Sequence, residues 1–445
     1  MLSLVALGAL LAAAPQPESV ESAADAEAAA LLASSPQAGL TIGVAREGAI
    51  FAKGYGRADA RTGEPASADT VYPICSISKN FAAAAVLKLA ESGKLELDAP
   101  VSRYFAKDPL PGRIVTVRQL LNHTSGAASY NEGADWSAVA ASPIPHERML
   151  TRIASEPYGT PGAAWGYSNS AFYLAGLLVE RLSGRSYWEY LAQAFFEPHG
   201  MHHASACTPV TQGRAHGRRV TKDGLEDAET ESWENPFAGG GLCATAGDLL
   251  AWQAALDQGK ALARKSVQLM RTPTTLAGGA ALDYGLGTRL GQLEGHPVVG
   301  HTGGGQGFST VLVRFPKDDL TLVVLTTTSA TEARIVAARL ARRLLGLPAF
   351  APMDLQVPAS LARAVSGRWL GDYGAAVIRP APNATRIVAE LGDSGPTLPF
   401  GFQGGATFAV GEEDLVRFVV KDGRSVLALE YVGGLFDSAT RRVAP

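Results

Sequence analysis

The chain has 445 residues, 47% of them hydrophobic and 18% charged, which is the composition of a folded protein long enough for about two or three domains. A formal net charge of −3 and the absence of any basic run argue against nucleic acid as a partner. The eight histidines and three cysteines show no spacing typical of metal ligands, so we expect no metal and no other cofactor.

The first 14 residues, Met1–Ala14, form an apolar stretch that ends in small residues. It is too short to cross a bilayer, which takes about 20 residues, and it is typical of a secretory signal peptide. It lacks a preceding Lys or Arg, so a buried N-terminal helix is the alternative. We expect a signal peptide over residues 1–14 and a periplasmic or secreted protein, with a cytoplasmic protein as the alternative. No cysteine follows directly, so we expect no stable membrane anchor.

Helix-forming and strand-forming segments alternate through the larger part of the chain. Leu40–Arg46 and Ala49–Tyr55 flank Glu47-Gly48, a pattern that predicts a β-hairpin. Apolar periodicity predicts helices over residues 18–32, 76–93, part of 115–126, 172–182, 249–256 and 332–345. Alternation predicts further strands over residues 297–301, 308–315 and 320–326.

Composition changes near the C-terminal end of this region. Residues 347–358 contain three prolines and little periodicity, which indicates a linker between domains. Short alternating runs separated by turns follow, for example Leu415–Val420 and Ser425–Tyr431, and one helical turn is expected near Ser360–Val365. We therefore expect residues 359–445 to form an all-β domain, most simply a meander closed as a small barrel.

The stretch Val71–Asn80 carries the pair Ser76 and Lys79 at the start of a predicted helix. Residues three apart lie on one face of a helix, so these side chains should lie side by side. A serine hydroxyl is a poor nucleophile until a base takes its proton, and burial at a helix N-terminus can make a lysine that base. Such a pair occurs by chance about once in a chain of this length, so an N-capping serine beside a solvated lysine is the alternative.

Four other stretches accompany this pair. Tyr167-Ser-Asn169 lies where a loop enters a helix, and His301-Thr-Gly303 ends a strand ahead of a glycine-rich hairpin. Leu120–Gly126 and Gly239–Asp248 are the other two. The glycine runs lack the lysine of a nucleotide phosphate loop and the strand–loop–helix order of a dinucleotide site, so they predict turns.

In this order and at this spacing, the motifs resemble the serine β-lactamase and penicillin-binding-protein superfamily. The most similar branch holds class C β-lactamases, D-alanyl-D-alanine carboxypeptidases, D-aminopeptidases and family VIII esterases. The resemblance implies an α+β fold over residues 15–346, with an antiparallel sheet flanked by helices and an all-helical subdomain. It also implies that residues 359–445 are a lipocalin-like β-barrel, as in some relatives.

The resemblance assigns a role to each motif residue. Ser76 would be the nucleophile that becomes acylated, and Lys79 would take or relay its proton. Tyr167 would be a second general base, with a buried structural aromatic as the alternative. Asn169 would hydrogen-bond the substrate amide and Lys79. His123, in the Leu120–Gly126 segment, is expected to be structural.

The third motif departs from the family, because β-lactamases carry a lysine where this chain has His301. A lysine there binds a substrate carboxylate, whereas an imidazole is mostly neutral at pH 7. This difference argues against an efficient β-lactamase. We expect His301 to be catalytic, with a histidine that only packs as the alternative. Thr302 and Gly303 should bind the substrate, and the backbone N–H groups of Gly304 and Ser76 should form an oxyanion hole.

These inferences predict a serine hydrolase that acts through an acyl-enzyme on ester, amide or D-amino-acid-containing peptide substrates. A penicillin-binding-type thioesterase that cyclises peptides is one alternative. A non-catalytic relative that binds cell-wall peptides is the other. The expected partner is a small-molecule or peptide substrate, and a homo-oligomer is compatible with the sequence.

The cysteines and two loops complete the expectations. Cys207 and Cys243 could pair in an oxidising compartment, but free buried thiols are the default. Cys75 should be a small core residue, since no His or basic neighbour in sequence would lower its pKa. Residues 131–161 and 197–234 are expected to be irregular and to line the cleft.

Overall fold

The structure is a computed structural model. It describes residues 18–442 except 133–134, 210, 222–223, 329–331, 352–354, 372–373, 381–386, 392–396, 405–406, 411–413, 422–424, 432–434 and 437–438. The signal peptide expected over residues 1–14 therefore lies outside the described residues.

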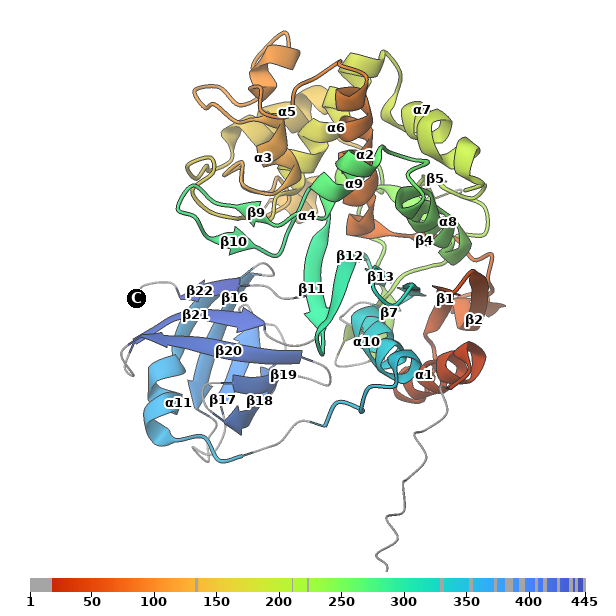
Figure 1. The fold of residues 1–445 in the computed structure, drawn as a ribbon, viewed down its shortest axis with the longest axis vertical. Coiled ribbons are helices and arrows are strands. Elements are labelled where there is room, and N and C mark those ends of the chain that lie inside the picture. The colour runs from red at the N-terminus through yellow and green to blue at the C-terminus, as the bar shows by residue number, and fades with distance from the viewer. Residues whose placement is uncertain are drawn as a thin grey trace, which may run out of the picture.

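A seven-stranded antiparallel sheet forms the centre of the larger domain, in the order β11-β12-β13-β14-β1-β2-β3 (Figure 1). The predicted hairpin is confirmed as β1 paired with β2 around Glu47 and Gly48, both of which have positive φ. The strands of this sheet are β1 (Gly39–Arg46), β2 (Ala49–Asp59), β3 (Glu64–Pro65), β11 (Arg289–Leu293), β12 (His296–Gly305), β13 (Phe308–Phe315) and β14 (Leu320–Thr326).

Helices cover both faces of the sheet. The helices α1 (Val20–Ser34) and α10 (Glu332–Leu345) pack on one face, where they share a core with the alternate β1 residues Leu40, Ile42 and Val44. On the other face, α8 (Ala246–Asp257) lies so close to β1 that a Cβ on Gly43 would be 3.1 Å from the Cβ of Ala246. The α+β fold with a large antiparallel sheet is confirmed.

The helical region above the sheet in Figure 1 is built around α2 (Ser78–Glu91), which is buried along almost its whole length. This explains why its apolar run is continuous rather than one-sided. Phe81 stacks on Trp252 with ring centroids 4.2 Å apart, and Asn80 accepts a hydrogen bond from the Trp252 indole. The other helices of this region are α3 (Val117–Leu121), α4 (Trp136–Val139), α5 (His146–Ser155), α6 (Asn169–Ser183), α7 (Tyr187–Leu191) and α9 (Arg264–Met270).

A three-stranded sheet joins the helical region to the rest, with β8 (Leu242–Ala244) between β4 (Tyr72–Pro73) and β5 (Ser205–Ala206). Cys207 and Cys243 form a disulfide beside it, with Cα atoms 4.9 Å apart. The expectation of free thiols is therefore wrong for this pair, whereas Cys75 is free and buried as predicted.

Four element predictions need correction. Residues 197–234, expected to be irregular, contain β5 and the hairpin of β6 (Arg218–Thr221) with β7 (Gly224–Asp227). Residues 131–161, expected to be irregular, contain α4 and α5. The helix predicted from Ser76 begins as a 3₁₀ turn over Cys75–Ile77 and becomes α2 at Ser78. The strand predicted to end at His301 continues as β12 through Gly305.

Beyond the linker, α11 (Ala359–Val365) precedes eight strands that pair antiparallel in chain order, and β22 pairs back with β15. These strands lie to the lower left of the main sheet in Figure 1. Leu435 and Phe436, between the last two strands, pack against β11 of the main sheet. The strands are β15 (Gly367–Gly371), β16 (Gly374–Pro380), β17 (Ile387–Leu391), β18 (Thr397–Gly404), β19 (Thr407–Val410), β20 (Asp414–Lys421), β21 (Ser425–Tyr431) and β22 (Ala439–Arg442).

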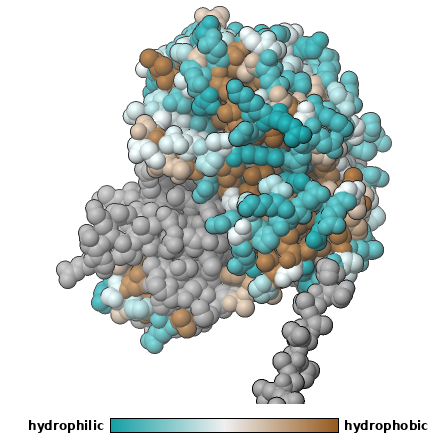
Figure 2. Space-filling view, viewed as in Figure 1, coloured by the Kyte–Doolittle hydropathy of each residue, from teal (hydrophilic) through white to brown (hydrophobic). Residues whose placement is uncertain are grey.

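The described residues on the face seen in Figure 2 are mostly polar. On the face shown in Figure 2, hydrophilic side chains predominate over the helical region, and hydrophobic residues lie between them in small groups. Among the helices described, none has the length and apolar character needed to span a membrane.

Candidate active site

Ser76 lies on the 3₁₀ turn that leads into α2, with a partly exposed side chain between buried neighbours. Cys75, which precedes it, has a φ of 49°, a left-handed conformation that is unusual for a residue other than glycine. Such a conformation persists only where surrounding contacts hold it in place. Here β12 packs directly on the turn, since a Cβ on Gly303 would lie 2.3 Å from the Ile74 carbonyl oxygen.

Lys79 is completely buried, and its ammonium group has three acceptors. Its Nζ donates to Ser76 Oγ at 3.0 Å, to Asn169 Oδ1 at 2.8 Å and to the Gly239 carbonyl oxygen at 2.6 Å. Burial lowers the pKa of Lys79 to about 7, and the positive charge of Arg289 acts in the same direction. Near neutral pH this amine therefore exists in both protonation states beside the serine hydroxyl. The predicted side-by-side placement of Ser76 and Lys79 is confirmed.

Tyr167 and Asn169 reach the same point from the start of α6. Ser168 caps this helix by accepting a hydrogen bond from the Ala171 N–H at 3.1 Å, which turns the chain so that its two neighbours face Lys79. Lys79 Nζ lies 4.8 Å from the centroid of the Tyr167 ring. The Asn169 amide also donates to Asn131 Oδ1 at 3.0 Å, so the 131–161 segment touches the site.

The His123 ring packs against the Tyr167 ring. Its ring is fully buried, lies 4.3 Å from the Tyr167 ring centroid to centroid, and accepts a hydrogen bond from the Ser168 N–H through Nδ1 at 3.0 Å. Burial, together with the charges of Lys79, His301 and Arg289, holds the pKa of His123 well below its usual value. The residue is therefore a neutral packing partner of Tyr167.

His301 lies on β12 with its ring centroid 6.4 Å from that of Tyr167, but it is only 1% exposed. Its Nδ1 donates to the Thr302 carbonyl oxygen at 2.6 Å, so Nε2 is the acceptor of the Tyr284 hydroxyl at 3.0 Å. Burial, followed by the charges of Arg289 and Lys79, keeps the pKa of His301 well below its usual value. The ring is neutral and both nitrogens are engaged within the chain. This arrangement favours a positioning role over the catalytic role predicted for His301.

Thr302, Gly303 and Gly304 follow on β12, next to the serine turn. Thr302 is partly exposed, Gly303 is buried against Ile74, and Gly304 is exposed. A Cβ on Gly304 would have no neighbour closer than 3.9 Å, so open space lies beside its backbone. This edge of β12 is therefore accessible next to Ser76.

Two groups of the site were not predicted. Arg289, the first residue of β11, is 6% exposed, and its guanidinium carbon lies 5.8 Å from the centroid of the Tyr167 ring. It brings a permanent positive charge into the site, yet no motif surrounds it in the sequence. The second unpredicted group is the Gly239 carbonyl. The glycine run around it predicted a turn, but it did not predict an acceptor for Lys79. Only the fold brings these two groups to the serine.

No three His, Cys, Asp or Glu side chains are grouped to hold a metal ion within the part of the chain that the structure describes. The arrangement contains instead the parts of nucleophilic acyl transfer. These are a hydroxyl, an amine whose pKa is lowered to about 7, a phenol above that amine and an accessible strand edge.

Comparisons with known proteins found relatives among penicillin-binding proteins and D-aminopeptidases. Penicillin-binding protein 4* of Bacillus subtilis (strain 168) is 27% identical over 304 residues, which cover 62% of this chain and 65% of that protein. A D-aminopeptidase of Gluconobacter oxydans (strain 621H) is 25% identical over 380 residues, 82% of this chain and 69% of its own. The chain thus spans about two thirds of the length of these relatives.

A solved structure shares the fold over nearly the whole chain. The octameric penicillin-binding protein homologue from Pyrococcus abyssi superposes with a TM-score of 0.67 at 22% identity, covering 95% of this chain and all of that one. The profile of the family described as Beta-lactamase matches residues 24–346, which include every site residue named above. The chain belongs to the beta-lactamase family.

Proposed function

We propose that this protein is a serine hydrolase that forms an acyl-enzyme on Ser76. The observation that carries the proposal is the buried Lys79 amine, 3.0 Å from the Ser76 hydroxyl and with its pKa lowered to about 7. A neutral amine at that distance can accept the hydroxyl proton as the oxygen attacks a carbonyl carbon. A lysine kept only for structure would not need a hydroxyl among its acceptors.

In the first step, Ser76 Oγ bonds to the substrate carbonyl carbon while its proton passes to Lys79. The developing oxyanion is stabilised by the backbone N–H groups of Ser76 and Gly304, each of which is worth about 3 kcal/mol in a transition state. Tyr167, with its ring 4.8 Å from the Lys79 amine, relays the proton to the leaving group. The carbon–leaving-group bond then breaks, and the ester on Ser76 remains.

In the second step, water attacks the ester carbonyl carbon and its proton passes to the same bases. The carbon–Oγ bond breaks, the Ser76 hydroxyl is restored and the acid is released. Asn169 binds the substrate amide, and Thr302 and Gly303 bind it along the edge of β12. We assign His301 a positioning role here, because its neutral ring is occupied by Tyr284 and the Thr302 carbonyl.

For the substrate class, we propose amides and esters of D-amino acids or peptides that contain them. The D-aminopeptidase relative aligns with 82% of this chain, which favours this class over β-lactams. The neutral His301 supports the same choice, since it offers no charge to a β-lactam carboxylate. None of the relatives named above favours a peptide-cyclising thioesterase or a non-catalytic binding protein.

We further propose a periplasmic or secreted location, a hydrolase domain over residues 15–346 and a lipocalin-like barrel after the linker at 347–358. The Cys207–Cys243 disulfide supports the location, because disulfides persist in oxidising compartments. The strand pairing from β15 to β22 supports the barrel. A homo-oligomer is proposed on the likeness to the octameric homologue alone.

A substrate panel tests the proposed function. Purified protein and a Ser76→Ala variant are assayed on paired D- and L-aminoacyl p-nitroanilides, p-nitrophenyl esters and nitrocefin. We expect turnover of the D-aminoacyl anilides and esters, slow or no hydrolysis of nitrocefin, and at least a 10³-fold (roughly) loss in Ser76→Ala. Equal rates in the wild type and the variant, or a preference for L-configured anilides, would contradict the proposal.

A further inference from the structure

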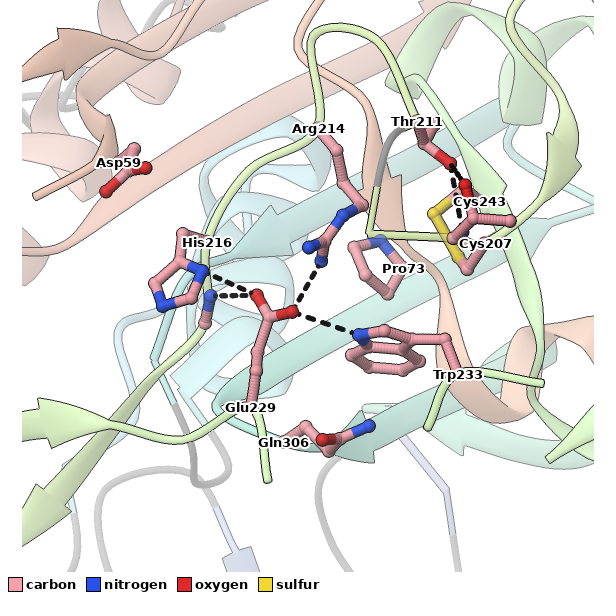
Figure 3. A network of polar contacts seen from close by, with 12 residues as sticks. Asp59, Pro73, Cys207, Thr211, Arg214, His216, Glu229, Trp233, Cys243 and Gln306 are labelled. Atoms are coloured by element: carbon pink, nitrogen blue, oxygen red, sulfur yellow. Dashed lines mark hydrogen bonds and ion pairs between the residues drawn. A yellow bond between two sulfur atoms is a disulfide. The ribbon is translucent and has the colours of Figure 1, made fainter. Parts of the chain in front are cut away.

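Between the two disulfide-bonded cysteines, Cys207 and Cys243, the described residues of 208–234 form an excursion beside the main sheet, and we refer to them as the excursion. The excursion contains the short hairpin β6 (Arg218–Thr221) and β7 (Gly224–Asp227). Figure 3 shows that its charged side chains converge near the disulfide and near Gln306. Neither the motifs nor the proposed mechanism use these charges.

Glu229 is the centre of this cluster, and its side chain is only 11% exposed. One carboxylate oxygen, Oε1, lies 2.9 Å from His216 Nδ1 and accepts from the Gly217 N–H at 3.1 Å. The other, Oε2, lies 2.8 Å from Arg214 Nη1 and accepts from the Trp233 indole at 3.1 Å. All four contacts come from the excursion itself, so this one carboxylate ties its two halves together (Figure 3).

A second carboxylate continues the cluster outward. His216 Nε2 lies 2.9 Å from Asp227 Oδ2, so this ring is placed between two carboxylates while being almost fully buried. Arg61 approaches Asp227 to 4.0 Å and is itself paired with Asp59. Neighbouring groups of this kind hold one another in place, and removing Glu229 would leave the buried His216 and Arg214 without their partner.

The excursion packs against the turn between β12 and β13. The Glu231 N–H donates to Gln306 Oε1 at 2.7 Å, and the Trp233 ring lies edge-on to Phe308 with centroids 5.8 Å apart. The backbones are so close that a Cβ on Gly217 would lie 2.1 Å from the Gln306 carbonyl oxygen. Gln306 has a φ of 46°, so this contact also stabilises a left-handed turn.

The excursion therefore adjoins two parts of the site, the end of β12 and the turn that accepts a hydrogen bond from Lys79. Gln306 lies two residues after the exposed Gly304, in the turn just beyond the end of β12, the strand that packs on the turn of Ser76. In the other direction, the excursion continues into the 3₁₀ turn Phe237–Gly239, whose last carbonyl accepts from Lys79. A displacement of the excursion would move the strand edge and the lysine acceptor together.

We propose that Glu229 is a positioning residue for acyl transfer, which acts through the excursion and Gln306 to hold the Gly304 N–H at its distance from Ser76. The inference rests on the proposed function, because it requires Gly304 to donate to an oxyanion. Donors aimed at an oxyanion act only within a few tenths of an ångström of the correct position. A paired buried carboxylate provides that rigidity where a loop turn alone would not.

Two variants test the proposal. Glu229→Gln keeps the size of the side chain and removes its charge. Gln306→Met removes the acceptor of the Glu231 N–H on the partly exposed turn and leaves the buried charges untouched. We expect each variant to lower kcat on the best substrate of the panel by about 10- to 100-fold, with KM within about threefold of the wild type, because misplacement of a donor weakens the transition state and not substrate binding.

Asp318→Asn is the matched control. Asp318 pairs with His296 at 2.9 Å, a His–carboxylate contact at the opposite end of β12 that touches neither the excursion nor Ser76. Its kcat should stay within twofold (roughly) of the wild type, while its thermal midpoint falls by as much as that of Gln306→Met.

Fluorophosphonate labelling of Ser76 distinguishes a failure of the positioning role of Glu229 from a failure of the proposed function. If the wild type is labelled but Gln306→Met and Glu229→Gln both keep the wild-type kcat, the positioning role alone is overturned. Unlabelled wild type would overturn the proposed function and this role with it. If Glu229→Gln does not fold, Gln306→Met decides, and a loss of kcat that only follows its unfolded fraction also counts against the proposal.

Discussion

Lys79 is the residue whose burial demands an explanation. A fully buried ammonium is among the least favourable groups in a protein core, and the usual outcome is that its pKa falls until the neutral amine is populated. Its acceptors are the Ser76 hydroxyl, the Asn169 amide and the Gly239 carbonyl, and none of them is a carboxylate that would restore the charge. The site therefore stabilises the neutral amine and not an ion pair.

The pH dependence of catalysis follows from this burial. The protonated amine cannot accept the Ser76 proton. For an uncharged ester, kcat/KM should therefore fall as the pH is lowered, and this acidic limb of the profile should lie at about 7, the pKa to which burial lowers Lys79. Because the charge of Arg289 also lowers this pKa, Arg289→Gln should move the limb to higher pH. A profile that is flat down to pH of about 5, or a limb that Arg289→Gln moves downward, would contradict the assignment.

At the residue scale, contiguous motifs could be predicted and isolated partners could not. Ser76, Lys79, Tyr167 and Asn169 sit in short patterns whose spacing already implies proximity. Arg289 is a single residue that reaches the site only because β11 pairs with β12, at Arg289 opposite Gly300. The same is true of Tyr284 and Asn131, whose hydrogen bonds to His301 and Asn169 join residues 17 and 38 positions apart in the chain.

At the scale of elements, the site depends on how closely β12 approaches the serine turn. Gly303 has no room for a side chain, because a Cβ would lie 2.3 Å from both the Ile74 carbonyl oxygen and Thr310 Oγ1. One of these neighbours is backbone, so the strand itself must move. This contact makes the glycine of the His-Thr-Gly motif a packing requirement as well as a part of the proposed substrate edge.

Gly303→Ala should therefore lower the free energy of unfolding by about 1–3 kcal/mol and reduce kcat by at least tenfold (roughly), since β12 is pushed off the turn. Urea unfolding and steady-state kinetics measure the two effects. Gly278→Ala is the control, because a Cβ there has no neighbour within 4 Å. Retention of both stability and kcat in Gly303→Ala would show that the strand does not pack on the turn as described.

The disulfide between Cys207 and Cys243 closes a loop of 36 residues that contains the excursion. Restriction of the unfolded chain by a loop of this length is worth about 4 kcal/mol in the chain-entropy treatment. The paired variant Cys207→Ser with Cys243→Ser should be destabilised by about that amount in urea unfolding. An unfolding midpoint equal to that of the oxidised wild type would contradict the pairing.

The predicted elements were most accurate where periodicity was strong. The hairpin β1–β2 and the strands β13 and β14 agree with the sequence prediction, because alternation and turn residues mark both ends of each. The end of β12 was misjudged, since Gly303–Gly305 read as a turn although tertiary contacts hold them in the sheet. The strand β11 was missed altogether, because its pairing with β12 and not its composition defines it.

At the scale of the whole molecule, the C-terminal strands are attached to the hydrolase domain by more than the linker. Leu435 is completely buried against β11, and a Cβ on Gly291 would lie 2.5 Å from its carbonyl oxygen. The contact covers one face of β11, which is the edge strand of the main sheet. The sequence predicted separate domains, but nothing in a short Gly-Gly-Leu-Phe stretch indicates that it packs on a distant strand.

Leu435→Ala should destabilise the hydrolase domain by about 2–5 kcal/mol, the usual cost of removing a buried leucine side chain. Urea unfolding followed by loss of hydrolase activity measures it in the full chain. Leu355→Ala provides the control, because Leu355 lies in the linker and is 45% exposed. Equal midpoints for Leu435→Ala and Leu355→Ala would show that the C-terminal contact does not support the hydrolase domain.

The proposal that Ser76 becomes acylated is tested most directly by intact mass after reaction with a fluorophosphonate, followed by peptide mapping. We expect one adduct per chain, located on Ser76, no adduct in Ser76→Ala, and labelling slowed by at least 10³-fold (roughly) in Lys79→Met, which loses the base but keeps the volume. An unlabelled wild type, or equal labelling of Ser76→Ala, would contradict the account.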